Sequence, residues 1–543
     1  MNLYLKISDS AGKTISHVEM GPHVSIPASM LADAGPVVSF SISVPIKDVA
    51  GYFNSSLQDG PVPRLDWTIE FDGSANRNEP ILTFISQGGE NRCTLYADNL
   101  IDDFQCKAVL NQETGCYDVN ITFANRTPCR PFSMYLDTRG GDWTEAYARA
   151  MVNLRPQGIP SFPEKAFAPV YCTWYAVHAC LTAGYLRRNA KRAADLGFGT
   201  FIVDDGWCID EAKRVSPAVI DTWYDHIGDW KFSERKLPEL KEDIAYARGL
   251  GLSCLFWVAP FFVFPESEAY GRLSDDERLT NRGACLFEPA SLRTAREVLG
   301  KMKAVVRDFG LDGLKVDFLD SMPADPYHPR GREAYDFIAR LSKAIRAEAG
   351  EDALIEFRQS YSTPQMLDFA TQFRPNDVPY DYLRNISRIA ALRILLGDHV
   401  PIQADPLFWR GDELDLTVAR HMIASLAGVP MLSMDLSDLS ERHEAIVRHY
   451  LGFYKEHQRI LNHGHWRIRY FGAQPSFVST TLGEERIVIV IDANALADAT
   501  EGANGTVRVL NLSSESIDGK EAFAMNGERL RDGKIPCGGR GTL

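Results

Sequence analysis

The stretch "GLKVDFLDS", residues 313–321, places a lysine and an aspartate two positions apart inside a short apolar run. Side chains alternate between the two faces of a β-strand, so Lys315 and Asp317 are expected on the same face. A second run, "TFIVDDGWC" at 200–208, ends in two adjacent acids, Asp204 and Asp205. A structural ion pair and a solvated strand end would account for both runs, and so would an active site built where buried strands end.

The fold around these runs is predicted from an alternation of strands and helices that begins at residue 169. Eight strand-like runs occur, at 169–176, 200–207, 252–260, 313–320, 353–360, 371–377, 399–405 and 429–436. The segments between them, such as 332–350, repeat apolar residues at steps of three and four, and several end in glycine. Eight such units predict a (β/α)8 TIM barrel. An open doubly wound sheet is the alternative.

The chain of 543 residues is too long for a single core, and its two ends have a different pattern from its centre. Residues 1–160 contain short, β-branched and aromatic segments between turn residues, which predicts an N-terminal β-sandwich. A proline-rich stretch at 155–169 connects it to the barrel, assigned to 161–462. Residues 463–543 return to β segments and predict a small C-terminal β-sandwich.

Composition limits the partners of the protein. The net charge of −14 argues against nucleic acid and anionic membranes. We find no run of about 20 apolar residues and no N-terminal apolar core of signal-peptide length. Ten scattered cysteines favour a reducing, cytoplasmic setting, although Cys93, Cys106, Cys116 and Cys129 could pair in an exported protein. The composition is compatible with a homo-oligomer.

Polar residues gather at the predicted carboxyl ends of the strands, where TIM barrels carry their active sites. They are Asp204, Asp205, Lys315, Asp317, Asp320, Arg358, Gln359, Arg374, Asn376, Asp377, His399, Asp405 and Asp435, of which we expect the last three to be structural or rim residues. Grouped carboxylates repel one another and raise one another's pKa. Groups with shifted pKa values are over-represented in functional sites. Histidine ligand patterns and glycine-rich phosphate loops are absent from the sequence, so we expect neither a metal nor a cofactor. Paired carboxylates beside aromatic residues suit glycoside hydrolysis.

Four motifs make the sequence familiar: residues 171–207, which end in "VDDGW", then "GDW" at 228–230, residues 236–257, which end in "LFW", and "GLKVDF" at 313–318. In order and spacing they resemble the α-galactosidases of glycoside hydrolase family 36. The resemblance covers roughly residues 170–460. It implies a retaining α-galactosidase that acts on a glycoside or oligosaccharide.

The resemblance also implies roles for individual residues. Asp317 corresponds to the nucleophile, and Asp377 in "RPND" to the acid/base. Asp204 and Asp205 correspond to the pair that holds the sugar's 4- and 6-hydroxyls. The other walls of the sugar site would be Trp174, Trp207, Trp257, Lys315 and Arg374. Arg358 has no secure family counterpart, and we expect it to bind substrate because of its strand-end position.

The residues themselves agree with the two catalytic roles in part. Lys315 beside Asp317 should keep that carboxylate ionised, because a nearby cation lowers its pKa. A proton donor needs a raised pKa, which Asp377 must obtain from burial or from Asp317, against Arg374 three residues away. A helix cap is the alternative role for Asp377, and Asp381 is the rival acid. Retention requires the two carboxyl groups to lie about 5–5.5 Å apart.

Two departures from the family pattern leave the identity of the bound sugar undecided. Ala259 stands where the family has a glutamate, and "EFRQSYSTPQ" at 356–365 replaces a turn rich in Cys, Ser and Gly. An α-linked sugar other than galactose (substituted, acidic, xylose or N-acetylgalactosamine) or a transglycosidase is therefore an alternative. A degenerate, carbohydrate-binding barrel is the alternative from another class. The presence of both Asp317 and Asp377 favours the enzyme.

Overall fold

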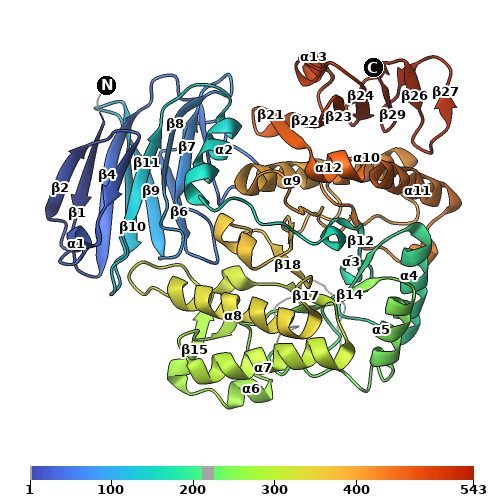
Figure 1. Cartoon of the computed structure of the whole chain (residues 1–543), viewed down its shortest axis with the longest axis horizontal. Coiled ribbons are helices and arrows are strands. Elements are labelled where there is room, and N and C mark those ends of the chain that lie inside the picture. The colour runs from blue at the N-terminus through green and yellow to red at the C-terminus, as the bar shows by residue number, and fades with distance from the viewer. Residues whose placement is uncertain (1–2, 211–225) are drawn as a thin grey trace.

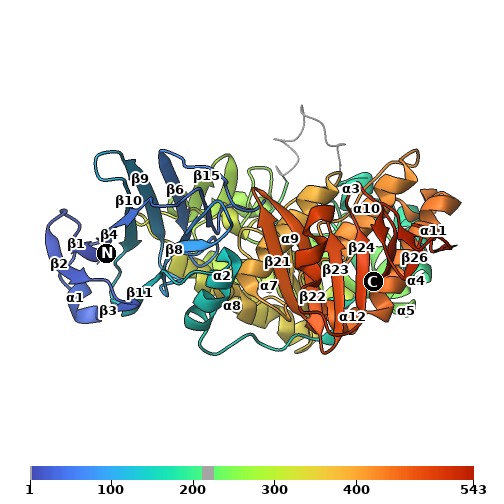
Figure 2. The same ribbon diagram turned by 90° about the horizontal axis from the view of Figure 1, so that it is seen from above.

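A computed structural model describes residues 3–210 and 226–543 of the chain. It has three parts, which follow one another along the sequence (Figures 1 and 2). The N-terminal sheets lie at one end of the molecule. The barrel lies beside them, and the C-terminal sheet packs against it through helices late in the chain.

The N-terminal part consists of two antiparallel sheets, as predicted. The six-stranded sheet has the order β2 (Thr14–Glu19), β1 (Tyr4–Ser8), β4 (Val37–Pro45), β10 (Cys116–Ala124), β9 (Phe104–Asn111), β6 (Thr68–Gly73). The five-stranded sheet has the order β3 (His23–Ile26), β11 (Phe132–Asp137), β8 (Asn91–Ala97), β7 (Ile81–Ile85), β5 (Gly51–Asn54). Alternate side chains of β4 and β9 enter the core between the sheets, where Phe40, Phe84 and Phe104 are buried. Helix α1 (Ala28–Leu31) lies among these strands, and α2 (Trp143–Leu154) follows them.

The central part is a curved sheet of seven parallel strands, and it confirms the predicted barrel class. Its order is β19 (Gln372–Arg374), β18 (Leu354–Arg358), β17 (Gly313–Val316), β14 (Ser253–Val258), β13 (Thr200–Val203), β12 (Val170–Cys172), β20 (Met431–Leu432). The predicted strand at 399–405 contributes only single bridges, from Ile402 to Phe373 and from Gln403 to Val429. These bridges close the ring between β19 and the segment that leads into β20. Pro401 shortens this strand because proline lacks the N–H group of a regular ladder.

Helices connect the barrel strands. They are α4 (Ala183–Leu196), α5 (Leu240–Gly249), α7 (Leu292–Phe309), α8 (Gly331–Ala349), α9 (Tyr382–Leu396) and α10 (Asp415–Ser425), with α11 (Glu441–Glu456) after the last strand. Gly197 and Gly310 end α4 and α7 with φ of 92° and 59°, a conformation that glycine adopts without strain. Between β18 and β19 the connection is the short 3-10 helix η4 (Pro364–Asp368). Shorter elements are α3 (Trp174–Val177), α6 (Glu268–Gly271), β15 (Arg278–Asn281), β16 (Ala284–Phe287) and α12 (Gln458–His463).

The C-terminal part is a seven-stranded sheet with a two-stranded sheet packed on it. The larger sheet has the order β21 (His465–Phe471), β22 (Gln474–Leu482), β23 (Glu485–Val490), β24 (Val507–Asn511), β29 (Arg540–Thr542), β26 (Glu521–Phe523), β27 (Arg529–Leu530). The smaller pairs β25 (Ile517–Asp518) with β28 (Lys534–Ile535), and α13 (Leu496–Thr500) lies between β23 and β24. Ile517 and Ile535 share a core with Val488 and Val509, so the two sheets form two layers.

The predicted domain boundaries fall between these parts and stay predictions. The first, after residue 160, lies between α2 and β12, and the second, after 462, lies in the last turn of α12. Among the described residues, we find no helix with the length and apolar character needed to cross a membrane. All ten cysteines are among the described residues, and each is a free thiol, including the four of the N-terminal part.

Candidate active site

A cavity of about 30 Å³ lies at the carboxyl ends of β13, β14, β17, β18 and β19. Its lining is Trp174, Asp204, Asp205, Trp257, Lys315, Asp317, Phe318, Arg358, Arg374 and Asp377. The structure thus brings together every predicted site residue except Trp207. The parallel strands place these side chains at one end of the sheet, which is why residues from distant parts of the sequence meet there.

Trp207 does not line the cavity. Its side chain is fully buried, and its ring packs against Phe256 and Trp230. Its indole Nε1–H donates to the carbonyl oxygen of Trp257 at 2.8 Å. Trp207 therefore supports the strand that carries Trp257, which does face the cavity.

Lys315 and Asp204 form a buried ion pair in the cavity wall. Both side chains are almost fully buried, and the backbone N–H of Asp204 donates to the Thr173 hydroxyl at 2.9 Å. Burial and the Arg374 charge oppose protonation of Lys315, but Asp204 and the other acidic groups around it together outweigh them, so the pKa of Lys315 lies above its usual range. The sequence suggested Lys315 as the partner of Asp317, whereas its ion pair in the structure is with Asp204.

Asp317 is surrounded by donors. Arg358 Nε lies 2.9 Å from its Oδ1, and the Trp257 indole N–H donates to its Oδ2 at 3.0 Å. The Tyr361 hydroxyl donates to Oδ1 at 3.3 Å. Burial alone would raise the pKa of Asp317, but the charges of Arg358 and Arg374 outweigh burial and hold the pKa below its usual range. Asp317 is therefore a carboxylate at neutral pH.

Arg358, the residue that departs from the family pattern, is fixed from two sides. Its guanidinium lies over the Phe318 ring, 4.7 Å from the ring centroid. Its Nη2 reaches Asp320 Oδ1 at 3.5 Å, while Nε contacts Asp317. Arg358 thus fills space directly against the proposed nucleophile.

Arg374 is the centre of a buried network of carboxylates. Its nitrogens lie 3.0 Å from Glu356, 3.1 Å from Asp405, 3.0 Å from Asp377 and 3.7 Å from Asp317. One guanidinium therefore contacts both proposed catalytic carboxylates. The sequence prediction did not include Glu356 in the site and treated Asp405 as a structural or rim residue. The position of Glu356 could have been predicted, because Glu356 and Arg358 lie two residues apart on one strand face, as Lys315 and Asp317 do.

Asp405 lies behind the cavity and is fully buried. Its Oδ2 accepts hydrogen bonds from the Val378 backbone N–H at 2.7 Å and from the Tyr175 hydroxyl at 3.1 Å. Burial, together with the neighbouring Asp377 charge, raises the pKa of Asp405 to about 8 despite Arg374. Through these hydrogen bonds, Asp405 holds the segment that follows Asp377.

Asp377 stands at the mouth of the cavity, where 46% of its side chain is exposed. Burial and the Asp317 charge raise its pKa, as expected, but Arg374 and Arg358 outweigh them, so the pKa of Asp377 is lowered. The expectation of a raised pKa is thus wrong for this state of the protein. The helix cap is another residue: Asp381 accepts a hydrogen bond from the Arg384 N–H at 2.9 Å at the start of α9.

The N-terminal part supports the loops of the site, which sequence analysis did not predict. Gln58 Nε2 donates to the Ser360 hydroxyl, and Gln58 Oε1 accepts from Asn376 Nδ2, both at 3.0 Å. Asp59 pairs with Arg384 at 2.9 Å. These contacts connect residues about 300 positions apart, so no local pattern could have revealed them.

The fold and the cavity together define a class: a parallel barrel whose strand ends carry paired carboxylates, the arrangement that barrel glycoside hydrolases use. Comparison with known proteins shows which family the chain is similar to. Residues 155–330 match the model of the Melibiase family, and the relatives found by sequence and by structure are α-galactosidases, several of them described as members of glycoside hydrolase family 36. The resemblance seen in the sequence is thereby confirmed.

The sequence relatives are distant. The chain is 33% identical over 127 residues to an α-galactosidase of Escherichia coli, which is 23% of this chain and 16% of that protein. It is 23% identical over 369 residues to the bifunctional α-galactosidase/sucrose kinase AgaSK of Mediterraneibacter gnavus, which is 64% of this chain and 37% of that protein. The matches thus span well under two thirds of these relatives.

Solved structures share the fold over most of the chain. The family 36 α-galactosidase AgaA of Geobacillus stearothermophilus, in complex with 1-deoxygalactonojirimycin, superposes with a TM-score of 0.66 at 13% identity, covering 99% of this chain and 87% of that one. The α-galactosidase TtGalA of Thermus thermophilus gives 0.56 at 16% identity, covering 87% and 95%. At these identities the likeness establishes the fold alone.

Proposed function

We propose that the chain is a retaining α-glycosidase that hydrolyses terminal α-galactosides through a covalent glycosyl-enzyme on Asp317. The observation that carries the proposal is the state of Asp317, a buried carboxylate kept ionised by Arg358 and Arg374 and oriented by Trp257. A second carboxyl group, Asp377, stands at the cavity mouth, where a leaving group would depart. The relatives described as α-galactosidases support the choice of sugar.

In the first step, an oxygen of Asp317 attacks the anomeric carbon while the bond from that carbon to the leaving oxygen breaks. Asp377 gives its proton to that oxygen. The Asp204–Lys315 pair and Asp205 would bind sugar hydroxyls through charge-assisted hydrogen bonds. The expected separation of about 5–5.5 Å between the two carboxyl groups stays a prediction.

In the second step, Asp377 takes a proton from water, and the water oxygen attacks the anomeric carbon and releases Asp317. Forming the ester removes the negative charge of Asp317, which had raised the pKa of Asp377, so Asp377 becomes easier to keep ionised as a base. The first step needs the opposite state, which Arg374 disfavours. We therefore expect substrates with sugar leaving groups to react fastest at acid pH, where Asp377 is protonated more often.

The cavity volume bears on the choice of sugar. At about 30 Å³ the cavity is an order of magnitude smaller than typical ligand pockets. Arg358 occupies space directly against the proposed nucleophile. Arg358, with Ala259 in place of a glutamate, favours a second candidate: a retaining enzyme or transglycosidase for another α-linked sugar.

A panel of nitrophenyl α-glycosides of galactose, xylose, arabinose, glucose and N-acetylgalactosamine tests the proposal and separates the candidates. NMR should detect the α-anomer as the first product. A β-anomer would exclude retention. If every glycoside stays uncoloured, a carbohydrate-binding role is favoured instead.

Azide rescue assigns the two carboxyl groups. Asp317→Gly should lose turnover on every substrate and, with azide, give a glycosyl azide of β configuration. Asp377→Ala should lose activity mainly on sugar leaving groups and, with azide, give the α azide. Asp381→Ala is the matched control, since Asp381 caps α9. Opposite products would reverse the assignment.

A further inference from the structure

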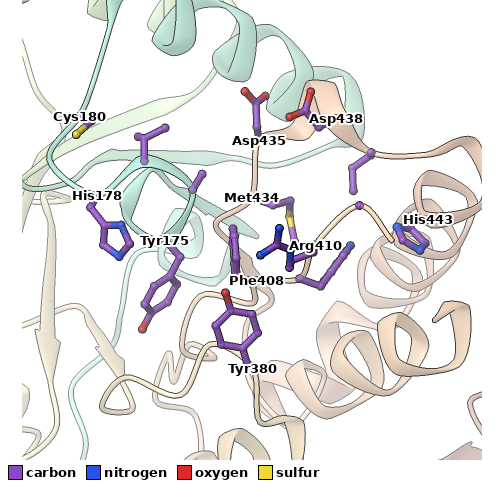
Figure 3. A pocket seen from close by; sticks show the side chains of 15 residues that line it. Tyr175, His178, Cys180, Tyr380, Phe408, Arg410, Met434, Asp435, Asp438 and His443 are labelled. Carbon is purple, nitrogen blue, oxygen red and sulfur yellow. The ribbon is translucent and has the colours of Figure 1, made fainter. Parts of the chain in front are cut away.

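The molecule has cavities outside the candidate active site. One of them, of about 580 Å³, lies beside the catalytic cavity, and Tyr175 in its wall donates to Asp405 of the catalytic network (Figure 3). Another, of about 830 Å³, is lined by residues of α2, α9 and β21, and thus by all three parts of the chain. These three elements lie side by side in both views of the molecule (Figures 1 and 2). We call it the junction cavity, and its wall includes Met151, Val152, Ile159, Arg393, Trp466 and Arg486.

The junction cavity lies at the end of the barrel opposite the catalytic cavity. Helix α9 begins at Tyr382, five residues after Asp377, and runs away from the carboxyl ends of the strands. Arg393 in its last turn and residues 397–399 beyond it line the junction cavity. A ligand bound there would therefore not occupy the proposed substrate site.

The lining of the junction cavity is basic, although the protein is acidic. It contains five arginines and three acidic residues, whereas the whole chain has a formal net charge of −14. Three of the arginines are paired with acids: Arg155 with Asp368, Arg467 with Asp498 and Arg469 with Asp142. Arg486 donates to the carbonyl oxygens of Ala499 and Glu501. A local excess of positive charge favours an anionic ligand.

The fifth arginine, Arg393, is a buried cation with unused hydrogen-bonding capacity. It is 5% exposed, and its guanidinium lies over the Trp466 ring, 3.8 Å from the ring centroid. Its Nε donates to the carbonyl oxygen of Ala427 at 2.7 Å. Arg393 Nη1 and the Trp466 indole Nε1 are both buried and have no hydrogen-bond partner in the part of the chain that the structure describes. Buried donors are nearly always paired, so two unpaired donors on stacked groups favour a ligand with acceptor oxygens.

The charge of Arg393 is only partly balanced by its surroundings. Burial lowers the pKa of Arg393 to about 9, against the opposing effect of Asp398. The oxygens of Asp398 are engaged elsewhere, by His465 Nδ1 at 2.6 Å and by the Trp466 backbone N–H at 3.0 Å. Arg393 is therefore a charged donor at neutral pH, and an anion beside it would be bound by charge as well as by hydrogen bonds.

Apolar side chains form the α2 side of the junction cavity. Val152 is 69% exposed and Ile159 is 37% exposed, and both line the cavity together with Met151. An apolar ligand would gain free energy by covering these side chains. The volume of about 830 Å³ lies within the range of about 300–1,000 Å³ that small-molecule sites have.

We propose that the junction cavity binds a small organic acid with one negative charge, a carboxylate whose apolar part packs against α2. The two carboxylate oxygens accept from Arg393 and from the Trp466 indole, because one buried guanidinium matches one planar carboxylate. The site is separate from the candidate active site. It is independent of the proposed function, since its ligand is detected by binding and without turnover.

The test measures the affinity of octanoate and of octanamide, its uncharged counterpart, by saturation-transfer NMR on the full chain. The parent should bind octanoate more tightly than octanamide. Arg393→Met keeps an apolar side chain on the Trp466 ring and removes the charge, so it should weaken octanoate about ten-fold or more and leave octanamide unchanged. Val152→Asp adds a carboxylate at an exposed position of α2, and it should weaken octanoate by repulsion even if Arg393→Met does not fold.

Arg508→Met is the matched control. Arg508 lies on β24 of the same C-terminal sheet, pairs with Glu485 at 3.3 Å and is not part of the lining, so this variant should keep the octanoate affinity of the parent. Circular dichroism confirms that each variant is folded. The proposal is overturned by a parent that does not bind millimolar octanoate, by equal affinities for octanoate and octanamide, or by an octanoate affinity that every folded cavity variant retains. Displacement of octanoate by an equal concentration of inorganic phosphate would overturn the choice of a carboxylate.

Discussion

Replacing Arg358 by methionine tests how the charge of the proposed nucleophile is maintained. Arg358 Nε lies 2.9 Å from Asp317 Oδ1, and methionine keeps an unbranched side chain of similar reach without the charge. Arg374, 3.7 Å from Asp317, and the Trp257 indole donor at 3.0 Å remain in place. The substitution therefore removes one of several groups that favour the carboxylate.

The size of the effect follows from Coulomb's law. At an effective dielectric constant of about 20, two unit charges about 4 Å apart interact by roughly 4 kcal/mol, an upper bound of about 3 pKa units. Aspartates beside an arginine are typically shifted by about 1–3 units. The pKa of Asp317 should accordingly rise by about 1–3 units in Arg358→Met. Because a protonated Asp317 cannot attack, the acid limb of kcat/KM should move to higher pH by the same amount.

The assay is the pH profile of kcat/KM on the nitrophenyl glycoside that the parent prefers, with circular dichroism at each pH to confirm that the protein stays folded. Arg192→Met is the matched control, because Arg192 pairs with Glu444 at 2.6 Å between α4 and α11, and neither residue lines the cavity. An acid limb that coincides with that of the parent would refute the assigned role of Arg358. An equal shift in the control would show that the effect is not local.

Three further substitutions have defined outcomes. Asp204→Asn should lower the free energy of unfolding by about 3–5 kcal/mol, because it leaves the buried Lys315 charge without its partner. The double variant Asp204→Asn/Lys315→Met should recover much of that loss, as measured by urea titration followed by tryptophan fluorescence. A double variant no more stable than the single one contradicts this. Gln58→Ala should lower kcat/KM, although Gln58 belongs to the N-terminal part, because it releases the loop before Asp377. A kcat/KM equal to that of the parent would argue that the N-terminal part does not support this loop. Asp381→Ala should cost about 0.5–2 kcal/mol of stability by removing a helix cap, and a loss of activity as large as that of Asp377→Ala would instead make Asp381 the acid.

The features that the sequence predicted well depend on short-range periodicity. Lys315 and Asp317 share a strand face because of the two-residue period, and both line the cavity. Asp204 and Asp205 lie there because a buried strand, β13, ends just before them. Strand ends of a parallel barrel converge, so recognising the barrel was enough to group these side chains.

The features that were missed depend on geometry that no local pattern encodes. Trp207 directly follows the acidic motif, yet the chain turns at Gly206, where φ is 100°, and the ring enters the core. The pairing of Lys315 with Asp204 in preference to Asp317 joins β17 to the end of β13 across the intervening strand β14, a placement that depends on the alignment of three strands. The lowered pKa of Asp377 depends on the reach of Arg374, which the sequence placed nearby without fixing its direction.

The hydrogen bonds of Gln58 to the loops after β18 and β19 limit how far the molecule can be treated as modular. A barrel excised at the predicted boundary would retain all the proposed catalytic side chains while losing the groups that hold two of its loops. Grafting the N-terminal part of a homologue onto this barrel would exchange those groups as well. The N-terminal part is therefore expected to be inherited together with its barrel, and substrate preference in chimaeras should follow the match at this junction as much as the barrel sequence itself.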